Sequence, residues 1–195
     1  AVRIVPRGTG FTLERDGKPY FIKGAGGTQK MELLVRSGGN SCRSWAVPTH
    51  AILDEAQRNG LSVLAGLSMA NARHGFNYRD PARVDAQRER IRKAVLALKG
   101  HPALLMWALG NEAELGARDE DRLLVWKEVE TLARMVKQLD PDHPVITVIA
   151  GVGKANLKEL AELAPSLDGV GINTYGGMMR LPEAVAAQGW KKAWL

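Results

Sequence analysis

The stretch His101-Pro-Ala-Leu-Leu-Met-Trp-Ala-Leu-Gly-Asn-Glu112 decides the fold prediction, because an uninterrupted apolar run meets an abrupt polar end. The run from Leu104 to Leu109 is typical of a strand that is buried on both faces, as in a parallel sheet. Gly110 stops the run, and Asn111 and Glu112 follow it. We therefore expect these two side chains at the carboxyl end of the strand, which is the functional edge of α/β proteins.

Short apolar runs recur on both sides of this stretch and alternate with longer segments of helical period, which predicts repeated βα units around a parallel sheet. Such a series can close as a barrel or open as a doubly wound sheet. Gly24-Ala-Gly-Gly27 lacks the spacing of a dinucleotide-binding fingerprint, so the barrel is favoured. The predicted strands are Tyr20 to Lys23, Ser41 to Trp45, Leu61 to Leu67, Leu104 to Leu109, Pro144 to Ile149 and Gly169 to Asn173, with a seventh beginning at Ala193.

Helix signals fall between the predicted strands. Thr49 is a suitable N-cap for a helix that Gly60 stops, and Asp80-Pro81 opens the next helix. A long helix is predicted to end at Asp140-Pro141, where proline prevents its continuation. Two further helices are expected around Leu157 to Leu163 and from Pro182 to Gln188.

The first residues follow a different pattern. Residues 2–20 alternate apolar and polar side chains, and Asp16-Gly17 is a turn sequence, so we predict a β-hairpin. The whole chain, residues 1–195, is expected to be one α/β domain. A lead-in hairpin takes residues 1–19, and residues 20–195 form an incomplete (β/α)₈ TIM barrel of about six βα units plus the start of strand seven.

Composition and charge distribution limit the classes of partner that we expect this protein to bind. The 195 residues carry a net charge of +6, which can attract nucleic acid. Between Asp85 and Lys93, however, basic and acidic side chains alternate beside apolar residues at helical spacing, which favours a solvated helix face. Cys42 is the single cysteine, no Cys/His cluster has metal-ligand spacing, and no apolar run is long enough for a membrane span. We expect no metal, no cofactor, no nucleic-acid partner and no membrane partner.

The sequence His-Pro, apolar strand, Trp, Gly-Asn-Glu resembles the acid/base signature of glycoside hydrolase family 2 and its wider clan A. The resemblance implies a retaining glycosidase or transglycosylase that acts on β-glycosidic bonds of a carbohydrate. It assigns the acid/base to Glu112 and the contact with the sugar 2-hydroxyl to Asn111. The alternative, without the resemblance, is that Glu112 caps the next helix or pairs with an arginine.

Two further segments are similar to the family in register. Asn40-Ser-Cys-Arg-Ser-Trp45 resembles its second strand, which implies that Arg43 lies under the nucleophile and keeps it ionised; a structural salt bridge is the alternative. Gly169-Val-Gly-Ile-Asn-Thr-Tyr175 resembles its sixth strand, which implies that Tyr175 donates to the nucleophile and Asn173 shapes the pocket. A rim tyrosine is the alternative for Tyr175.

Three residues are weaker candidates. His74, in the loop after the third predicted strand, can contact a sugar or have no role. Trp45 can stack on a pyranose or pack in the rim. Glu114 is near Glu112 in the sequence, but two residues on it is expected to point into solvent.

A retaining mechanism needs a second carboxylate, and the resemblance puts this nucleophile at the end of strand seven, beyond Leu195. The chain alone is then expected to have little activity, and its unfinished barrel edge is expected to favour self-association. Two alternatives remain open: a non-catalytic carbohydrate-binding barrel, and a phosphate-binding aldolase or isomerase barrel. The location is also open, since polysaccharide chemistry fits a periplasmic or secreted protein as well as a cytoplasmic one.

Overall fold

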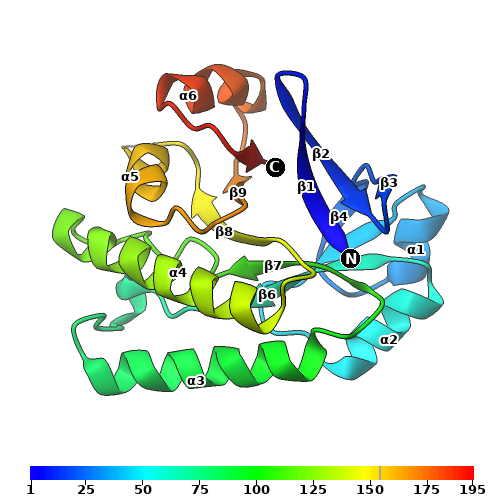
Figure 1. The fold of residues 1–195 in the computed structure, drawn as a ribbon, viewed down its shortest axis with the longest axis horizontal. Coiled ribbons are helices and arrows are strands. Elements are labelled where there is room, and N and C mark those ends of the chain that lie inside the picture. The colour runs from blue at the N-terminus through cyan, green and yellow to red at the C-terminus, as the bar shows by residue number, and fades with distance from the viewer. Residues whose placement is uncertain (154) are drawn as a thin grey trace.

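The computed structural model, which describes residues 1–153 and 155–195, contains a seven-stranded parallel sheet that curls like part of a barrel wall (Figure 1). Its strands lie side by side in chain order, because each is paired in parallel with the next. The strands are β4 (Gly24–Gly26), β5 (Ser41–Arg43), β6 (Ser62–Leu67), β7 (Leu104–Leu109), β8 (Val145–Ala150), β9 (Gly169–Asn173) and β10 (Ala193–Trp194). The predicted partial (β/α)₈ barrel is confirmed.

One helix follows each of the first six strands of this sheet. They are α1 (Met31–Arg36), α2 (His50–Arg58), α3 (Pro81–Leu98), α4 (Asp119–Leu139), α5 (Asn156–Leu163) and α6 (Leu181–Ala187). Thr49 caps α2 by accepting a hydrogen bond from the Ile52 amide at 3.2 Å, and the Asp80 side chain caps α3 in the same way, as predicted. Helix α1 completes the first of the predicted βα units, although no bounds were predicted for it. Within the described residues, no helix combines the length and apolar character that crossing a membrane requires.

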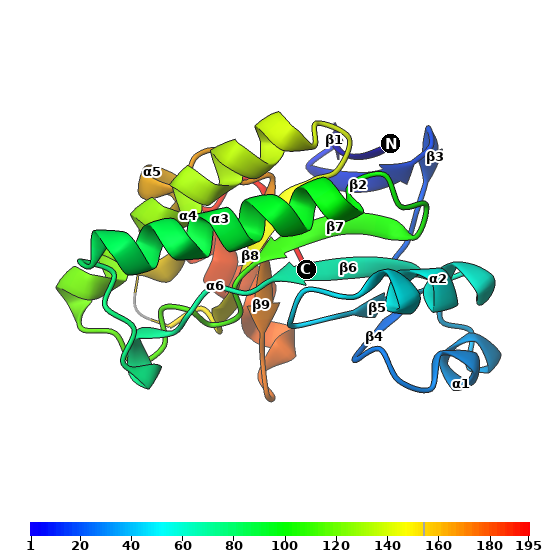
Figure 2. The ribbon, with the colours of Figure 1, turned by 90° about the horizontal axis from the view of Figure 1, so that it is seen from below.

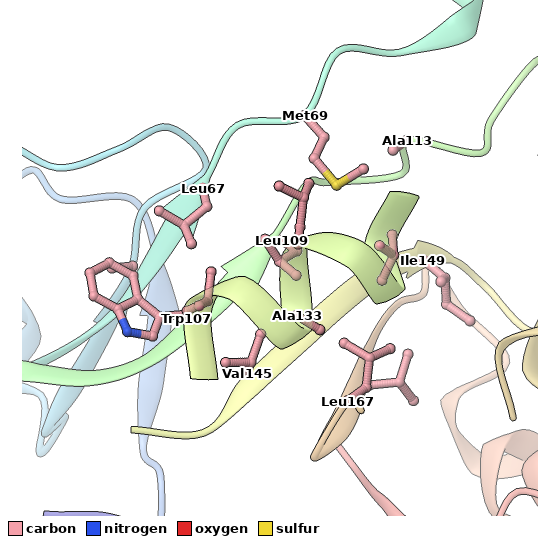
Figure 3. Close-up of a cluster of buried hydrophobic side chains, with 14 of the residues drawn as sticks. Leu67, Met69, Trp107, Leu109, Ala113, Ala133, Val145, Ile149 and Leu167 are labelled. Carbon is pink, nitrogen blue, oxygen red and sulfur yellow. The ribbon is translucent and has the colours of Figure 1, made fainter. Parts of the chain in front are cut away.

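Side chains that alternate along the strands build two cores. The larger one lies between the sheet and the helices, where Leu67, Leu109 and Ile149 of three neighbouring strands gather near Ala133 of α4 (Figure 3). Helices α3 and α4 run along this outer face of the sheet (Figure 2). The smaller core lies on the inner face and includes Leu64, Met106, Ile146 and Val148 together with Val2 of the N-terminal strand.

A separate antiparallel sheet precedes the barrel strands. It has three strands, β1 (Val2–Arg7), β2 (Gly10–Arg15) and β3 (Lys18–Pro19), so the prediction of a single hairpin missed one strand. Asp16 and Gly17 form the predicted turn, with φ values of 52° and 75°. The Val2 amide donates to the Asp142 carbonyl just before β8 at 2.8 Å. This sheet therefore covers the amino ends of the barrel strands and leaves their carboxyl ends uncovered.

The predicted first strand, Tyr20 to Lys23, is wrong by four residues, because β4 begins at Gly24. The Asn40 side chain explains the difference. Its Nδ2 donates to the Phe21 carbonyl at 2.8 Å, and its Oδ1 accepts from the Lys23 amide at 2.8 Å. A side chain thus takes the place that a neighbouring strand would have, and residues 20–23 lie outside the sheet.

Candidate active site

Four polar side chains meet at the carboxyl edge of the sheet: Arg43 at the end of β5, Asn111 and Glu112 just after β7, and Asn173 at the end of β9. Arg43 donates to Asn111 Oδ1 at 2.7 Å and to Asn173 Oδ1 at 3.1 Å. Asn173 Nδ2 in turn donates to Asn111 Oδ1 at 3.0 Å and to Glu112 Oε1 at 2.8 Å. These residues, which lie up to 130 positions apart in the chain, form one connected network.

The network fixes the orientation of the Asn111 amide. Its Oδ1 accepts from both the Arg43 guanidinium and Asn173 Nδ2, so the oxygen faces the inside of the cluster. The amide nitrogen is then the part of Asn111 that can donate to a bound molecule. Glu112, whose Oε1 accepts from Asn173, presents its carboxyl beside that donor.

Arg43 carries a positive charge that is only partly compensated. Its guanidinium lies 5.5 Å from the Trp45 ring centroid, an attractive cation–π distance. Its Nε is buried without a hydrogen-bond partner, and among the described residues it makes no ion pair. Burial lowers the pKa of Arg43, and the nearby Glu112 and Tyr175 act in the opposite sense. The alternative of a structural salt bridge within the described part of the barrel is therefore not what Arg43 makes.

Glu112 has an unusual backbone conformation, with φ of 52°. The left-handed region costs a non-glycine residue about 1–2 kcal/mol. Two hydrogen bonds hold it there: the Glu112 amide donates to the Val148 carbonyl at 2.8 Å, and Asn71 Nδ2 donates to the Glu112 carbonyl at 2.8 Å. Sequence reasoning missed Asn71, because a bond from a side chain to a distant carbonyl leaves no local pattern.

Trp45 lies on the rim, with 49% of its surface exposed. A hollow of about 580 Å³ lies next to it and is lined by Gly26, Gly27 and Ser44 among others. Gly26 leaves room for the indole, since a Cβ there would lie 2.8 Å from the Trp45 ring. This exposed ring beside a hollow is compatible with the stacking role that we predicted, which stays a prediction.

Tyr175 and His74 are exposed loop residues outside the hydrogen-bonded network, although Tyr175 is close enough to Arg43 to affect its pKa. Tyr175 is 95% exposed on the loop after β9, and His74 is exposed in a short 3₁₀ helix after β6. Neither side chain makes a hydrogen bond with a described residue. Their predicted contacts, with a nucleophile and with a sugar, remain predictions.

The expectation that Glu114 points into solvent is wrong. Its side chain is 5% exposed, and its Oε1 accepts from the Ala150 amide at the end of β8 at 2.7 Å. Burial raises the pKa of Glu114, and the charge of Glu112 adds to that effect. The turn that carries Glu112 is thus anchored to β8 by the residue two places later.

No group of three or more His, Cys, Asp or Glu residues that could hold a metal ion occurs in residues 1–153 and 155–195. The site consists of one carboxyl, two amides and one guanidinium. These groups can donate to hydroxyls, accept from them, and transfer a proton at Glu112.

A curled parallel βα sheet with a polar cluster at its carboxyl edge defines a protein of the TIM-barrel class. Residues 50–188 match the family described as "Glycosyl hydrolases family 2, TIM barrel domain". The chain belongs to this family.

Two curated relatives agree with this assignment, and a solved structure shares the fold. The chain is 29% identical to a beta-galactosidase of Aeromonas hydrophila subsp. hydrophila in an alignment of 158 residues that covers 70% of this chain and 14% of that protein. It is 30% identical to a beta-galactosidase of Arthrobacter sp. (strain B7) in an alignment of 121 residues that covers 57% of this chain and 12% of the relative. A beta-D-glucuronidase structure from Dictyoglomus thermophilum shares the fold, with a TM-score of 0.71 at 19% identity over 100% of this chain and 38% of that one. The chain thus spans about one seventh of the length of these curated relatives.

Proposed function

We propose that this chain supplies the acid/base half of a retaining glycoside hydrolase that acts on β-glycosidic bonds. The observation that carries the proposal is the position of Glu112 at the carboxyl edge, hydrogen-bonded to Asn173 and beside the fixed amide of Asn111. Membership of family 2 supports the same class of reaction. The beta-galactosidase relatives are named for that chemistry.

In the first step, protonated Glu112 gives its proton to the glycosidic oxygen as the bond to the leaving group breaks. A second carboxylate attacks the anomeric carbon from the opposite face and forms a glycosyl-enzyme intermediate. In the second step, ionised Glu112 removes a proton from water, which displaces the enzyme carboxylate. Asn111 Nδ2 donates to the 2-hydroxyl oxygen of the sugar, since its Oδ1 is occupied by Arg43 and Asn173.

The nucleophile in this proposal is a glutamate beyond Leu195. Arg43 supports that part, because it is partly buried, has an Nε without a partner and lacks an ion pair with any described residue. A buried charge of this kind requires a partner of opposite sign. A carboxylate from the next part of the barrel would supply it.

The test compares the 195-residue chain with the same chain extended by the roughly eighty residues that complete a barrel of about 250 to 280 residues. Both proteins are assayed on aryl β-glycosides. We expect turnover from the extended protein only, and a fluorinated glycoside should label a glutamate beyond Leu195. Equal turnover from both proteins would contradict the location of the nucleophile. Sugar binding by the extended protein without turnover would instead favour a carbohydrate-binding barrel.

A further inference from the structure

The main-chain carbonyl of Glu112 accepts a hydrogen bond from a side chain that no part of the reaction uses. Asn71 Nδ2 donates to this carbonyl at 2.8 Å, from the loop that follows β6. The Leu115 amide shares the same carbonyl at 3.1 Å. The peptide units on both sides of Glu112 are thereby held, one by Val148 of β8 and the other by Asn71.

This restraint matters because the backbone of Glu112 is strained. A φ of 52° is readily adopted by glycine, but in other residues it persists only where the surroundings hold it. The direction of the Cα–Cβ bond, and therefore of the carboxyl, depends on that φ. If the peptide after Glu112 were released, the residue could relax to an ordinary conformation and its carboxyl would leave Asn173.

Asn71 is itself held in place from the helix layer. The residue before it, Ala70, has both main-chain groups fixed: its amide donates to Gln87 Oε1 at 2.8 Å, and its carbonyl accepts from the Tyr78 hydroxyl at 2.5 Å. Gln87 is completely buried on α3. Burial raises the pKa of Tyr78 to about 12, so its hydroxyl keeps the proton that this bond needs.

The two loops are also packed against each other. Gly110 has φ of 69°, and a Cβ there would lie 3.2 Å from the Met69 Cβ. A Cβ at Gly116 would lie 2.7 Å from the Arg73 Cβ. Met69 and Ala113, which come from the two loops, lie near each other above the outer core (Figure 3).

We propose that Asn71 is a positioning residue for Glu112: it transmits the rigidity of α3 through Ala70 to the strained peptide that aims the acid/base carboxyl. This inference rests on the proposed function of Glu112. Asn71 does not touch substrate in this role. Its loss should therefore affect proton donation more than sugar binding.

The experiment uses the extended enzyme with two substrates of the same sugar, one with a dinitrophenyl leaving group and one with an unactivated alcohol. Asn71→Asp keeps the size of the side chain and removes the donor. We expect kcat/KM on the unactivated substrate to fall by about 10- to 100-fold, the size expected of a misplaced catalytic group. The dinitrophenyl substrate, which needs no proton, should change by less than about 3-fold.

Asn59→Asp is the matched control, because Asn59 Nδ2 also donates to a main-chain carbonyl, that of Glu55 at 2.9 Å, at the other end of the barrel. It should change neither substrate. If Asn71→Asp is not recovered folded, Asn71→Ser is measured in its place with the same expectation. Equal losses on both substrates, or none on either, overturn the inference. If Glu112→Gln also loses no more activity on the unactivated substrate than on the dinitrophenyl substrate, the proposed function of Glu112 is wrong. If Glu112→Gln shows that difference between the substrates and the Asn71 variant does not, only the role of Asn71 is wrong.

Discussion

Replacing Gly66 by alanine tests how the floor of the site is packed. Gly66 lies in β6, directly beneath the chain that leaves β5. A Cβ at this position would lie 2.2 Å from the Trp45 carbonyl oxygen and 2.7 Å from that of Ser44. Both contacts are with backbone, so a side-chain rotation cannot relieve them.

The size of the effect follows from these distances. Extending 2.2 Å to the 3.4 Å of an ordinary contact requires a movement of roughly 1.2 Å in a closely packed region. Overpacking of this kind costs typically 1–3 kcal/mol and occasionally more, and we expect at least about 3 kcal/mol for Gly66→Ala because only backbone can yield. For a chain of this length that lowers Tm by about 6–12 °C. Arg43 precedes the displaced segment, and its 2.7 Å bond to Asn111 would not survive such a movement.

Thermal unfolding of the 195-residue chain, followed by circular dichroism, measures the effect. Gly100→Ala is the control, because a Cβ there meets nothing within 4 Å and its φ is not positive. It should shift Tm by no more than about 2 °C, as expected for a change within 0.5 kcal/mol. A Tm for Gly66→Ala within the same range would refute the packing that we describe beneath Trp45.

Three further predictions concern buried polar groups. Trp107→Phe should destabilise the chain by about 2–4 kcal/mol in urea unfolding, because a buried Nε1–Asp140 bond of 2.8 Å is lost along with packing volume. Burial opposes ionisation of Asp140, but the hydrogen bonds from His143 and Trp107 outweigh burial, and the pKa of Asp140 is lowered. The stability of the chain should therefore fall as pH drops below the pKa of about 3.9 that Asp140 has in the unfolded chain. Trp107→Phe should weaken that dependence. Burial raises the pKa of Glu114, so the chain should lose stability as pH rises and the Glu114 carboxyl ionises in the folded state. Glu114→Gln keeps the hydrogen bond from the Ala150 amide and should make the chain at least as stable as the unsubstituted chain at neutral pH. A lower Tm for Glu114→Gln at neutral pH would contradict this.

The sequence predicted the barrel well because its signals are local. The strands Leu104–Leu109 and Gly169–Asn173 have the predicted bounds, and Thr49 and Asp80 cap their helices, since apolar runs and caps depend on neighbouring residues. The displacement of the first strand depended on a side chain, Asn40, that is distant in sequence.

The candidate site was predicted in part for the same reason. Arg43, Asn111, Glu112 and Asn173 meet because the carboxyl ends of parallel strands share one edge, which strand order alone can predict. The burial of Glu114 could not be read from the sequence, since it depends on how the loop after β7 bends back to β8.

The most direct test of the central claim is the leaving-group dependence of Glu112→Gln in the extended enzyme, with Glu114→Gln as the matched control two residues away. If Glu112 is the acid, its variant should lose about 10²- to 10⁴-fold in kcat/KM on an unactivated β-glycoside and far less on the dinitrophenyl glycoside. Glu114→Gln should show no such difference between the two substrates. A Glu112→Gln enzyme that hydrolyses both glycosides as well as the unsubstituted enzyme would contradict the account.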